Sequence, residues 1–302
     1  MTKFRLKAVV FVIAYLNLLG GADAKSLVLG RVSSDPLKVY KQLTPMVDYV
    51  ASRMTDLGIT DGTVLVAKDH RSMLDLLREK KVDWVQKGVF EAVSYKREAG
   101  AELALRSWRQ GVPSYTAVIF SRKDGPVNSI ADLVGKKLAF EDPGSTSAFF
   151  VPSAILMRAG YQLRELGSPR DKTPMGVIGY AFAGDELSIS TWVHRGLADA
   201  GAYHNQNWDN PGDNPESMKK DFRIIYQGKP MPRMIESFRG DLDPKLKHRI
   251  KEILLRAHED PAAKQALQSY GPDTKRFDEF VGEAKKELDE AIELESFFNR
   301  RR

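Results

Sequence analysis

Apolar positions along the chain follow two different periods, which alternate over most of its length. Runs typical of strands occur at 26–32, 62–67 and 82–85, and helical spacing occurs at 37–54 and 72–79. Strands that alternate with helices form a mainly parallel sheet, because each parallel crossover needs a covering helix. The first part of the chain therefore predicts an α/β lobe.

The same alternation begins again near Tyr115. Three further strands and three further helices are predicted, at 116–120, 130–133, 137–140, 145–159, 188–194 and 198–203. The chain is long enough for two domains. We therefore expect two α/β lobes of similar build.

A short internal sequence similarity supports the presence of two lobes of similar build. The segment 77–85 resembles 193–201, since each has a helix end, a turn, an aspartate and a strand. This similarity gives Lys87 and Tyr203 equivalent places at the carboxyl ends of strands, where such sheets bind ligands. Both residues are therefore candidates for ligand contact.

The last third of the chain changes character. A polar stretch at 206–216 predicts a long loop, and a strand follows at 222–226. Three amphipathic helices are then expected on the first lobe, at 244–258, 262–270 and 277–298.

These assignments define the expected domains. The first lobe comprises residues 25–114 and 206–302, and the second comprises 115–205. The chain then crosses between lobes near 111–115 and near 204–209, and two such crossings form a hinge that permits closure around a ligand.

Residues 1–24 have the features of a secretory signal. A basic start precedes an apolar run at 8–19 that is too short to span a bilayer, and Ala22 and Ala24 give the small-residue cleavage pattern. We predict cleavage after Ala24 and a periplasmic location. A membrane anchor is the alternative interpretation of this segment.

Charge and cysteine content exclude several classes of function. The chain has 46 basic and 40 acidic residues and no cysteine, so disulfides, thiolate metal sites and thiol nucleophiles are excluded. No basic run other than 300–302 suggests a nucleic-acid surface. No histidine and carboxylate cluster has convincing metal-ligand spacing, so neither a metal nor a cofactor is expected.

The most distinctive motif is a strand that ends in a Pro-Gly turn and three hydroxyl residues, Ser145, Thr146 and Ser147. These residues open a predicted helix, whose first amide groups lack internal partners and carry the positive end of its dipole. Amides and hydroxyls together could hold a tetrahedral oxyanion. An ordinary helix cap is the alternative. Pro152 lacks the amide that would bond the Ala148 carbonyl, which predicts a kink.

The run 132–152 (DLVGKKLAFEDPGSTSAFFVP) resembles the periplasmic phosphate, phosphite and phosphonate-binding proteins of ABC importers. In their D-P-x-S-T-S-G-x-x-V-P signature, Ala148 replaces the usual glycine. The resemblance covers essentially the whole chain after residue 24. It implies the two-lobed type II periplasmic-binding-protein fold and a small oxyanion ligand held between the lobes.

The resemblance also implies further ligand contacts. His70 and Lys87 fall where the family has tyrosines, and Asp185 falls near a family histidine. Lys87 would add a positive charge for an anion, whereas a solvated pair of Lys87 and Asp185 is an equal alternative. Arg233 is interpreted as an exposed loop cation and His204 as a hinge residue.

We therefore expect a monomeric solute-binding protein that delivers its ligand to a permease in the inner membrane. A sensor subunit that presents its closed form to a histidine kinase or chemoreceptor is the main alternative. A hydrolase with Ser145 as nucleophile is disfavoured, because no G-x-S-x-G or H-E-x-x-H motif occurs. An enzyme is therefore not expected.

Overall fold

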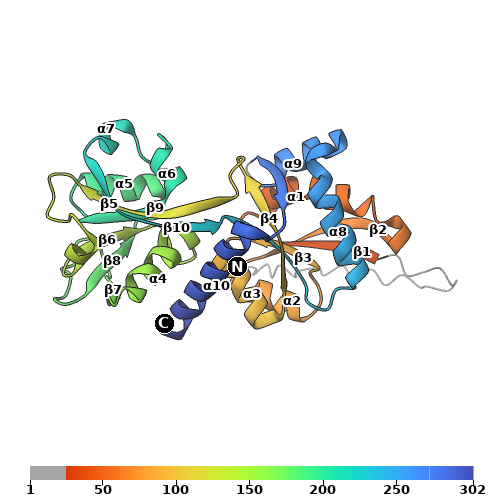
Figure 1. Cartoon of the computed structure of the whole chain (residues 1–302), viewed down its shortest axis with the longest axis horizontal. Coiled ribbons are helices and arrows are strands. Elements are labelled where there is room, and N and C mark those ends of the chain that lie inside the picture. The colour runs from red at the N-terminus through yellow and green to blue at the C-terminus, as the bar shows by residue number, and fades with distance from the viewer. Residues whose placement is uncertain (1–24, 272, 302) are drawn as a thin grey trace, which may run out of the picture.

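The computed structural model describes residues 25–271 and 273–301. The predicted cleavage site after Ala24 lies outside this part of the chain. Two α/β lobes lie side by side along the longest axis of the molecule (Figure 1). Each lobe is built on one six-stranded sheet, so the predicted two-lobed α/β architecture is confirmed.

The sheet of the first lobe has the order β12-β4-β11-β3-β1-β2. In this sheet β1 pairs in parallel with β2 and β3, whereas β11 runs antiparallel to β3 and β4. Its strands are β1 (Lys25–Val32), β2 (Ile59–Ala67), β3 (Trp84–Lys87), β4 (Glu102–Arg109), β11 (Met234–Phe238) and β12 (Thr274–Asp278).

The sheet of the second lobe has the order β10-β5-β9-β6-β8-β7, in which β10-β5-β9-β6-β8 repeats the arrangement of β4-β11-β3-β1-β2 and the additional strand lies at the opposite edge. Here β6 pairs in parallel with β8 and β9, and β5 runs antiparallel to β9 and β10. Its strands are β5 (Ser114–Arg122), β6 (Lys137–Phe140), β7 (Leu163–Glu165), β8 (Ile178–Phe182), β9 (Ala200–His204) and β10 (Phe222–Pro232).

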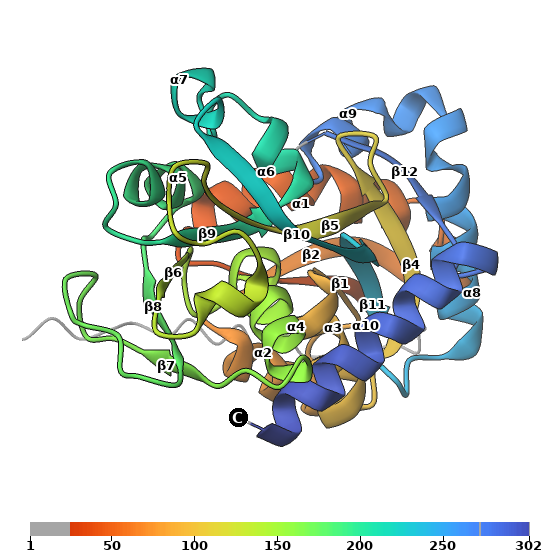
Figure 2. The same cartoon turned by 60° about the vertical axis from the view of Figure 1, so that its left-hand side comes forward.

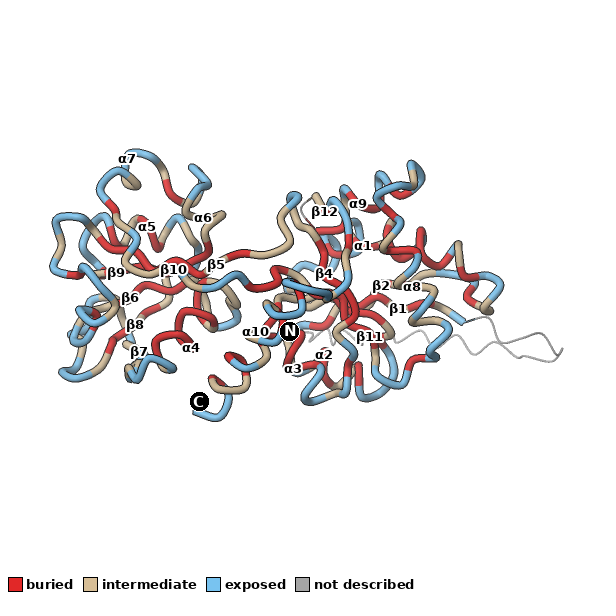
Figure 3. The backbone as a smooth tube through the Cα atoms, viewed as in Figure 1, coloured by how far each residue is buried: buried red, intermediate tan, exposed pale blue. Residues whose placement is uncertain are grey.

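Helices cover the sheets and leave the strands as the buried centre of each lobe (Figure 3). Four of them begin at an aspartate whose carboxylate accepts a bond from the amide two or three residues later, at Asp35, Asp69, Asp185 and Asp243. The helices are α1 (Pro36–Ala51), α2 (His70–Arg78), α3 (Val89–Ala99), α4 (Val151–Arg158), α5 (Glu186–His194), α6 (Asn205–Asp209), α7 (Glu216–Lys219), α8 (Pro244–Arg256), α9 (Lys264–Ser269) and α10 (Gly282–Arg301).

The chain passes between the lobes from β4 to β5, as expected, and returns from β10 to β11. The return differs from the expected crossing near 204–209, because β10 pairs with β5 along most of its length and so belongs to the second lobe. Two prolines near its end, Pro230 and Pro232, fit an edge strand, which needs fewer amide donors. The stretch expected as a loop at 206–216 also contains most of α6, together with the start of α7.

Helix α10 packs on both lobes, whereas the sequence predicted that it packs on the first lobe. It contacts α3 of the first lobe, and α4 and β10 of the second. Glu290 accepts bonds from Arg158 at 2.6 Å and Lys229 at 3.1 Å, and the Phe298 ring lies 5.5 Å from that of Phe150. Figure 2 shows the helix running along the molecule beside α4. It is a third link between the lobes, added to the two chain crossings.

Candidate functional site

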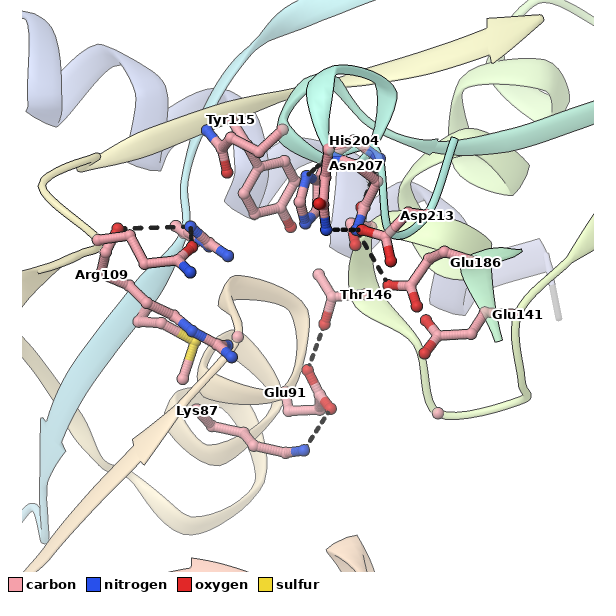
Figure 4. Close-up of a pocket in the computed structure, with 18 of the residues that line it drawn as sticks. Lys87, Glu91, Arg109, Tyr115, Glu141, Thr146, Glu186, His204, Asn207 and Asp213 are labelled. Carbon is pink, nitrogen blue, oxygen red and sulfur yellow. Dashed lines mark hydrogen bonds and ion pairs between the residues drawn. The ribbon is translucent and has the colours of Figure 1, made fainter. Parts of the chain in front are cut away.

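A cavity of about 700 Å³ lies between the lobes and is lined by residues of both. This volume is within the range of small-molecule sites in proteins. Most of the lining side chains are charged or carry amides, and four of them are basic and four acidic (Figure 4). The charged residues are Arg31, Lys87, Glu91, Arg109, Glu141, Glu186, Asp213 and Arg233.

Three arginines form what we call the cationic wall. Arg31 and Arg109 lie at the carboxyl ends of β1 and β4 of the first lobe. Arg233 lies at the return crossing, where its amide donates to the Pro113 carbonyl at 2.9 Å and so joins the two crossings. Within the described part of the chain, no carboxylate forms an ion pair with any of the three.

Arg233 is the buried member of the cationic wall, whereas Arg31 and Arg109 are half-buried and Arg31 donates to the Gln86 side chain at 2.7 Å. Arg233 is 9% exposed, and its guanidinium has only long bonds of 3.4 Å to Gln110 and to the Arg109 carbonyl. Burial and the nearby charges of Arg233 and Arg31 lower the pKa of Arg109 to about 10. Burial also lowers the pKa of Arg233. An anion in the cavity would relieve this repulsion.

The opposite side of the cavity, which we call the acidic wall, comes from the second lobe. Glu141 follows β6, Glu186 begins α5 and Asp213 follows α6. The side-chain amide of Asn207 donates to Asp213 at 2.8 Å and to Glu186 at 3.3 Å. Burial raises the pKa of Glu141 to about 7 and also raises that of Glu186, and the neighbouring carboxylates add to both shifts.

A histidine and a tyrosine lie between the two walls (Figure 4). His204 is the last residue of β9 and caps α6, because its Nδ1 accepts a hydrogen bond from the backbone amide of Asn207 at 3.2 Å. In the neutral ring the proton is therefore on Nε2. Burial, followed by the charges of Arg233 and Arg109, lowers the pKa of His204 to about 3. Its ring lies 5.3 Å from that of Tyr115, whose buried hydroxyl has no hydrogen-bond partner among the described residues.

Among the residues predicted from the sequence, Thr146, Ser147 and Lys87 line this cavity. The Thr146 hydroxyl donates to Glu91 at 2.5 Å, and the Lys87 ammonium lies 3.0 Å from the same carboxylate. Glu91 belongs to α3 of the first lobe, so the bond to Thr146 spans the two lobes. The two lobes lie close together at this point, since a Cβ added at Gly88 of the first lobe would lie 2.8 Å from the Thr146 hydroxyl oxygen of the second.

Ser145 caps the helix that Thr146 opens, and its hydroxyl accepts a bond from the Ala148 amide at 3.1 Å. It does not line the cavity. The first turn, Thr146–Phe150, is π-helical. Pro152 has no amide hydrogen to donate to the Ala148 carbonyl, which instead accepts a hydrogen bond from the Glu141 backbone amide at 3.3 Å. The irregularity predicted from Pro152 is thus a π-turn rather than a simple kink.

The other three predicted residues lie away from this cavity. His70 bonds Ser94 at 2.9 Å and lines a separate cavity of about 380 Å³ beside α10. Asp185 is the exposed cap of α5, and Tyr203 is fully buried in the second lobe, where its ring lies 4.7 Å from Phe120. Ligand contacts of these three side chains stay predictions.

The sequence interpretation missed most of the charged lining. Arg109 ends a strand that was not predicted, and Arg233 was interpreted as exposed although it is buried. Glu186 and His204 each directly follow a predicted candidate, Asp185 and Tyr203. A rule that considers every titratable residue within two positions of a predicted strand end or helix start would have found Glu186 and His204, but not Arg109 and Arg233.

Comparisons with known proteins agree on one family. Residues 32–283 match the family described as "ABC transporter, phosphonate, periplasmic substrate-binding protein". The phosphonates-binding periplasmic protein of Escherichia coli K12 is 24% identical over 253 residues, which are 82% of this chain and 70% of that protein.

Solved structures give a further match. XAC2383 from Xanthomonas citri, bound to chloride, is 35% identical with a TM-score of 0.84, over 92% of this chain and 99% of that one. The same protein bound to ATP gives 34% and 0.83, over 91% and 98%. PhnD1 from Prochlorococcus marinus, in complex with methylphosphonate, is 17% identical with a TM-score of 0.61, over 92% and 99%, and shows a shared fold. No helix among the described residues is long and apolar enough to cross a membrane.

Proposed function

The chain belongs to the periplasmic substrate-binding proteins of phosphonate ABC transporters, and from that premise we propose that it captures a small oxyanion between its lobes. The proposed ligand class is phosphate, phosphite or phosphonate, and the proposed recipient is an ABC permease in the inner membrane. The fold is that of type II periplasmic binding proteins, and the family is periplasmic and binds solutes.

The cationic wall is the observation that carries this proposal. Three guanidinium groups in one cavity, one buried and two half-buried, with no carboxylate partner among the described residues are unfavourable, because they repel one another and burial removes part of their hydration. Such a cluster is retained where a ligand supplies the missing negative charge. Guanidinium groups suit phosphorus oxyanions in particular, since their planar donors match two oxygens at once.

The geometry supports a capture mechanism that uses both lobes. Arg31 and Arg109 would hold the anion from the first lobe, and Arg233 would hold it from the crossing. Ser147 and Thr146 would add hydroxyl donors from the second lobe, and Lys87 a further cation. An anion that bonds both lobes would favour closure about the two chain crossings, with α10 moving along one of the lobes it contacts.

The comparisons add support for an anion site in this fold. The Xanthomonas protein, about a third identical over nearly its whole length, has been solved with chloride and with ATP, and both are anions. The sensor alternative gains nothing from the relatives named above. The hydrolase alternative gains nothing either, since the Ser145 hydroxyl bonds an amide, and no described histidine is hydrogen-bonded to it.

Calorimetric titration of protein purified from the periplasm tests the proposal. Phosphate, phosphite and methylphosphonate are added separately, with sulfate as the competing tetrahedral anion. We expect heat and a rise in melting temperature for at least one phosphorus oxyanion, since a ligand that binds only the folded state stabilises it. Absence of binding for all three, in protein that unfolds cooperatively, would reject the proposal.

The variant Arg233→Met assigns the binding to the cavity. It should lower the affinity by about 100-fold, because a buried charge pair is lost. Arg71→Met is the matched control, since Arg71 is 76% exposed and lies outside this cavity. Equal affinities of the two variants would place the anion elsewhere.

A further inference from the structure

The cavity is much larger than a bare oxyanion. Its volume of about 700 Å³ corresponds to some 20 water molecules, at about 30 Å³ each. A phosphate ion has five heavy atoms and would occupy the cationic wall alone. The remaining space adjoins the acidic wall, which repels an anion and must therefore receive another part of the ligand.

The side chains around that space are those that bind hydroxyl groups. Besides the three carboxylates of the acidic wall, the side-chain amides of Gln206, Asn207 and Asn210 line the cavity. Carboxylates accept hydrogen bonds, and amides both donate and accept them. A hydroxyl group also does both, so several hydroxyls on one ligand can satisfy a wall of mixed carboxylates and amides.

Besides the Nε atoms of Arg31 and Arg109 in the cationic wall, two further buried polar atoms of the lining have no hydrogen-bond partner in the described structure. They are the Gln206 side-chain oxygen and the Tyr115 hydroxyl. The Gln206 nitrogen is already bonded to the Ser114 carbonyl at 3.2 Å, so the amide is oriented and its oxygen is left as an acceptor. A buried acceptor without a partner is unfavourable and is suited to a donor on the ligand.

The lining is poorly suited to an apolar group. Tyr115 is its one aromatic ring apart from His204 among the described residues, and it is 4% exposed. No open aromatic face is therefore available for stacking a nucleobase. Val32 and Met234 are the other large apolar lining residues, which leaves little surface for an alkyl chain.

Resting on the function proposed above, we infer that the physiological ligand is a phosphorylated polyol or sugar. Its phosphate lies on the cationic wall, and its hydroxyl groups bond the acidic wall and the neighbouring amides. The ligand then bonds the first lobe through its charge and the second lobe through its hydroxyls, and so draws the lobes together.

Titration with a matched set of probes tests this inference. The set is inorganic phosphate, sn-glycerol 3-phosphate, glucose 6-phosphate, glucose, 2-aminoethylphosphonate and ATP. We expect a hydroxylated phosphate ester to bind at least about tenfold more tightly than phosphate, since hydrogen bonds to charged groups strongly discriminate ligand hydroxyls. Glucose without phosphate should show no measurable binding.

The remaining outcomes separate this inference from the proposed function. Equal affinity for phosphate and for both esters overturns the inference and leaves the proposed function intact. Tightest binding of 2-aminoethylphosphonate or of ATP also overturns it, in favour of an amine or a nucleotide. No binding of any probe rejects the proposed function itself.

The variant Glu186→Gln locates the hydroxyl subsite. It should weaken binding of the preferred ester by about tenfold, because a charged acceptor is replaced by a neutral one. It should tighten phosphate binding, because one repelling carboxylate is removed. Glu216→Gln, on an exposed residue of the same lobe, is the matched control. Parallel loss of both affinities in Glu186→Gln would contradict a separate hydroxyl subsite.

Discussion

The two walls of the cavity stand on equivalent sheets yet carry opposite charge. Five strands of each lobe have the same arrangement, and each lobe presents residues near strand ends and helix starts to the gap between them. The first lobe and the return crossing supply the cationic wall, and the second lobe supplies the acidic wall. The fold therefore determines where the ligand lies, whereas the side chains of each lobe determine which end of a ligand it receives.

The same physical cause acts on both walls with opposite sign. Burial lowers the pKa of Arg109 and raises the pKa of Glu141, because it disfavours the charged form of each group. Like charges on the same wall increase both shifts. A ligand with an anionic end and a donor-bearing end would reduce the electrostatic penalty of both walls. Functional sites are where proteins tolerate such local penalties.

The largest expected effect comes from removing charge from the cationic wall. The double variant Arg109→Met/Arg233→Met should lower phosphate or ester affinity by more than about 100-fold. It should also raise Tm by about 2–4 °C, because two cations without ion pairs, one buried and one half-buried, are replaced by apolar side chains. Calorimetry and thermal unfolding measure the two effects on the same sample.

Loss of affinity together with loss of stability would contradict this account. It would mean that the two arginines support the fold and that their effect on binding is indirect. The matched variant Arg71→Met should change neither quantity, since that side chain is largely exposed on α2.

A smaller effect is expected from acid, through His204. Its pKa is about 3 in the folded protein, below the ordinary value of 6.5, so the unfolded state binds more protons between these values. Stability is therefore fully present above pH 6.5 and falls as the pH is lowered toward 3. Between pH 6.5 and 4.5 this amounts to about 2 kcal/mol.

The variant His204→Asn should remove that component of the acid sensitivity. Asparagine keeps an acceptor near the Nδ1 position for the Asn207 amide and is a favourable helix cap, but it does not titrate. Urea unfolding at pH 4.5 and 7 measures the difference, with His258→Asn on the surface of the first lobe as control. An unchanged pH dependence would show that His204 is not held neutral by its burial and by the neighbouring arginines.

The acidic wall predicts the opposite dependence at a smaller size. The pKa of Glu141 is raised from 4.5 to about 7, so the folded state binds the extra proton between these values. Stability from this group is present below pH 4.5 and is lost as the pH rises through 7. Because Glu141 is partly solvated, we expect Glu141→Gln to gain only about 1 kcal/mol over the wild type at pH 8 and nothing at pH 4.5.

Urea unfolding at the two pH values checks this prediction, and Glu216→Gln is the control in the same lobe. A gain of equal size at both pH values would mean that the substitution acts through packing rather than through ionisation.

Much of the fold could be predicted because its core strands are apolar and regularly spaced. The elements from β1 to β3 and from β5 to β9 follow hydrophobic patterns, with β7 and β8 the exceptions. The predicted strand at 222–226 was shorter than β10, because the second half of β10 contains Gly228 and two prolines. Prolines within a strand are tolerated mainly at a sheet edge, where β10 lies. Position at an edge is a property of the assembled sheet, so the local sequence did not reveal it.

The site was harder to predict, since charge in a sequence does not show burial. Arg233 follows a Pro-Met-Pro run that is typical of an exposed loop, yet it is 9% exposed because the two crossings bond to each other there. The residues of the Ser-Thr-Ser motif were found from a local pattern, a strand end followed by a helix start. The cationic wall comes from three distant segments, and only the assembled fold brings them together.

The smallest expected effect concerns the hydroxyl residues of the second lobe. If the cationic wall provides most of the affinity, Thr146→Val with Ser147→Ala should weaken phosphate binding by only about three- to tenfold, the value of one neutral hydrogen bond. In the structure the Thr146 hydroxyl already donates to Glu91, so a ligand gains only the difference between two acceptors. Calorimetry measures the change, and Thr191→Val, which removes a hydroxyl from α5 that bonds the Leu187 carbonyl, is the control. A loss above about 100-fold would move the main anion contact from the first lobe to the start of this helix, and the contrast between the two walls would no longer describe how the ligand is held.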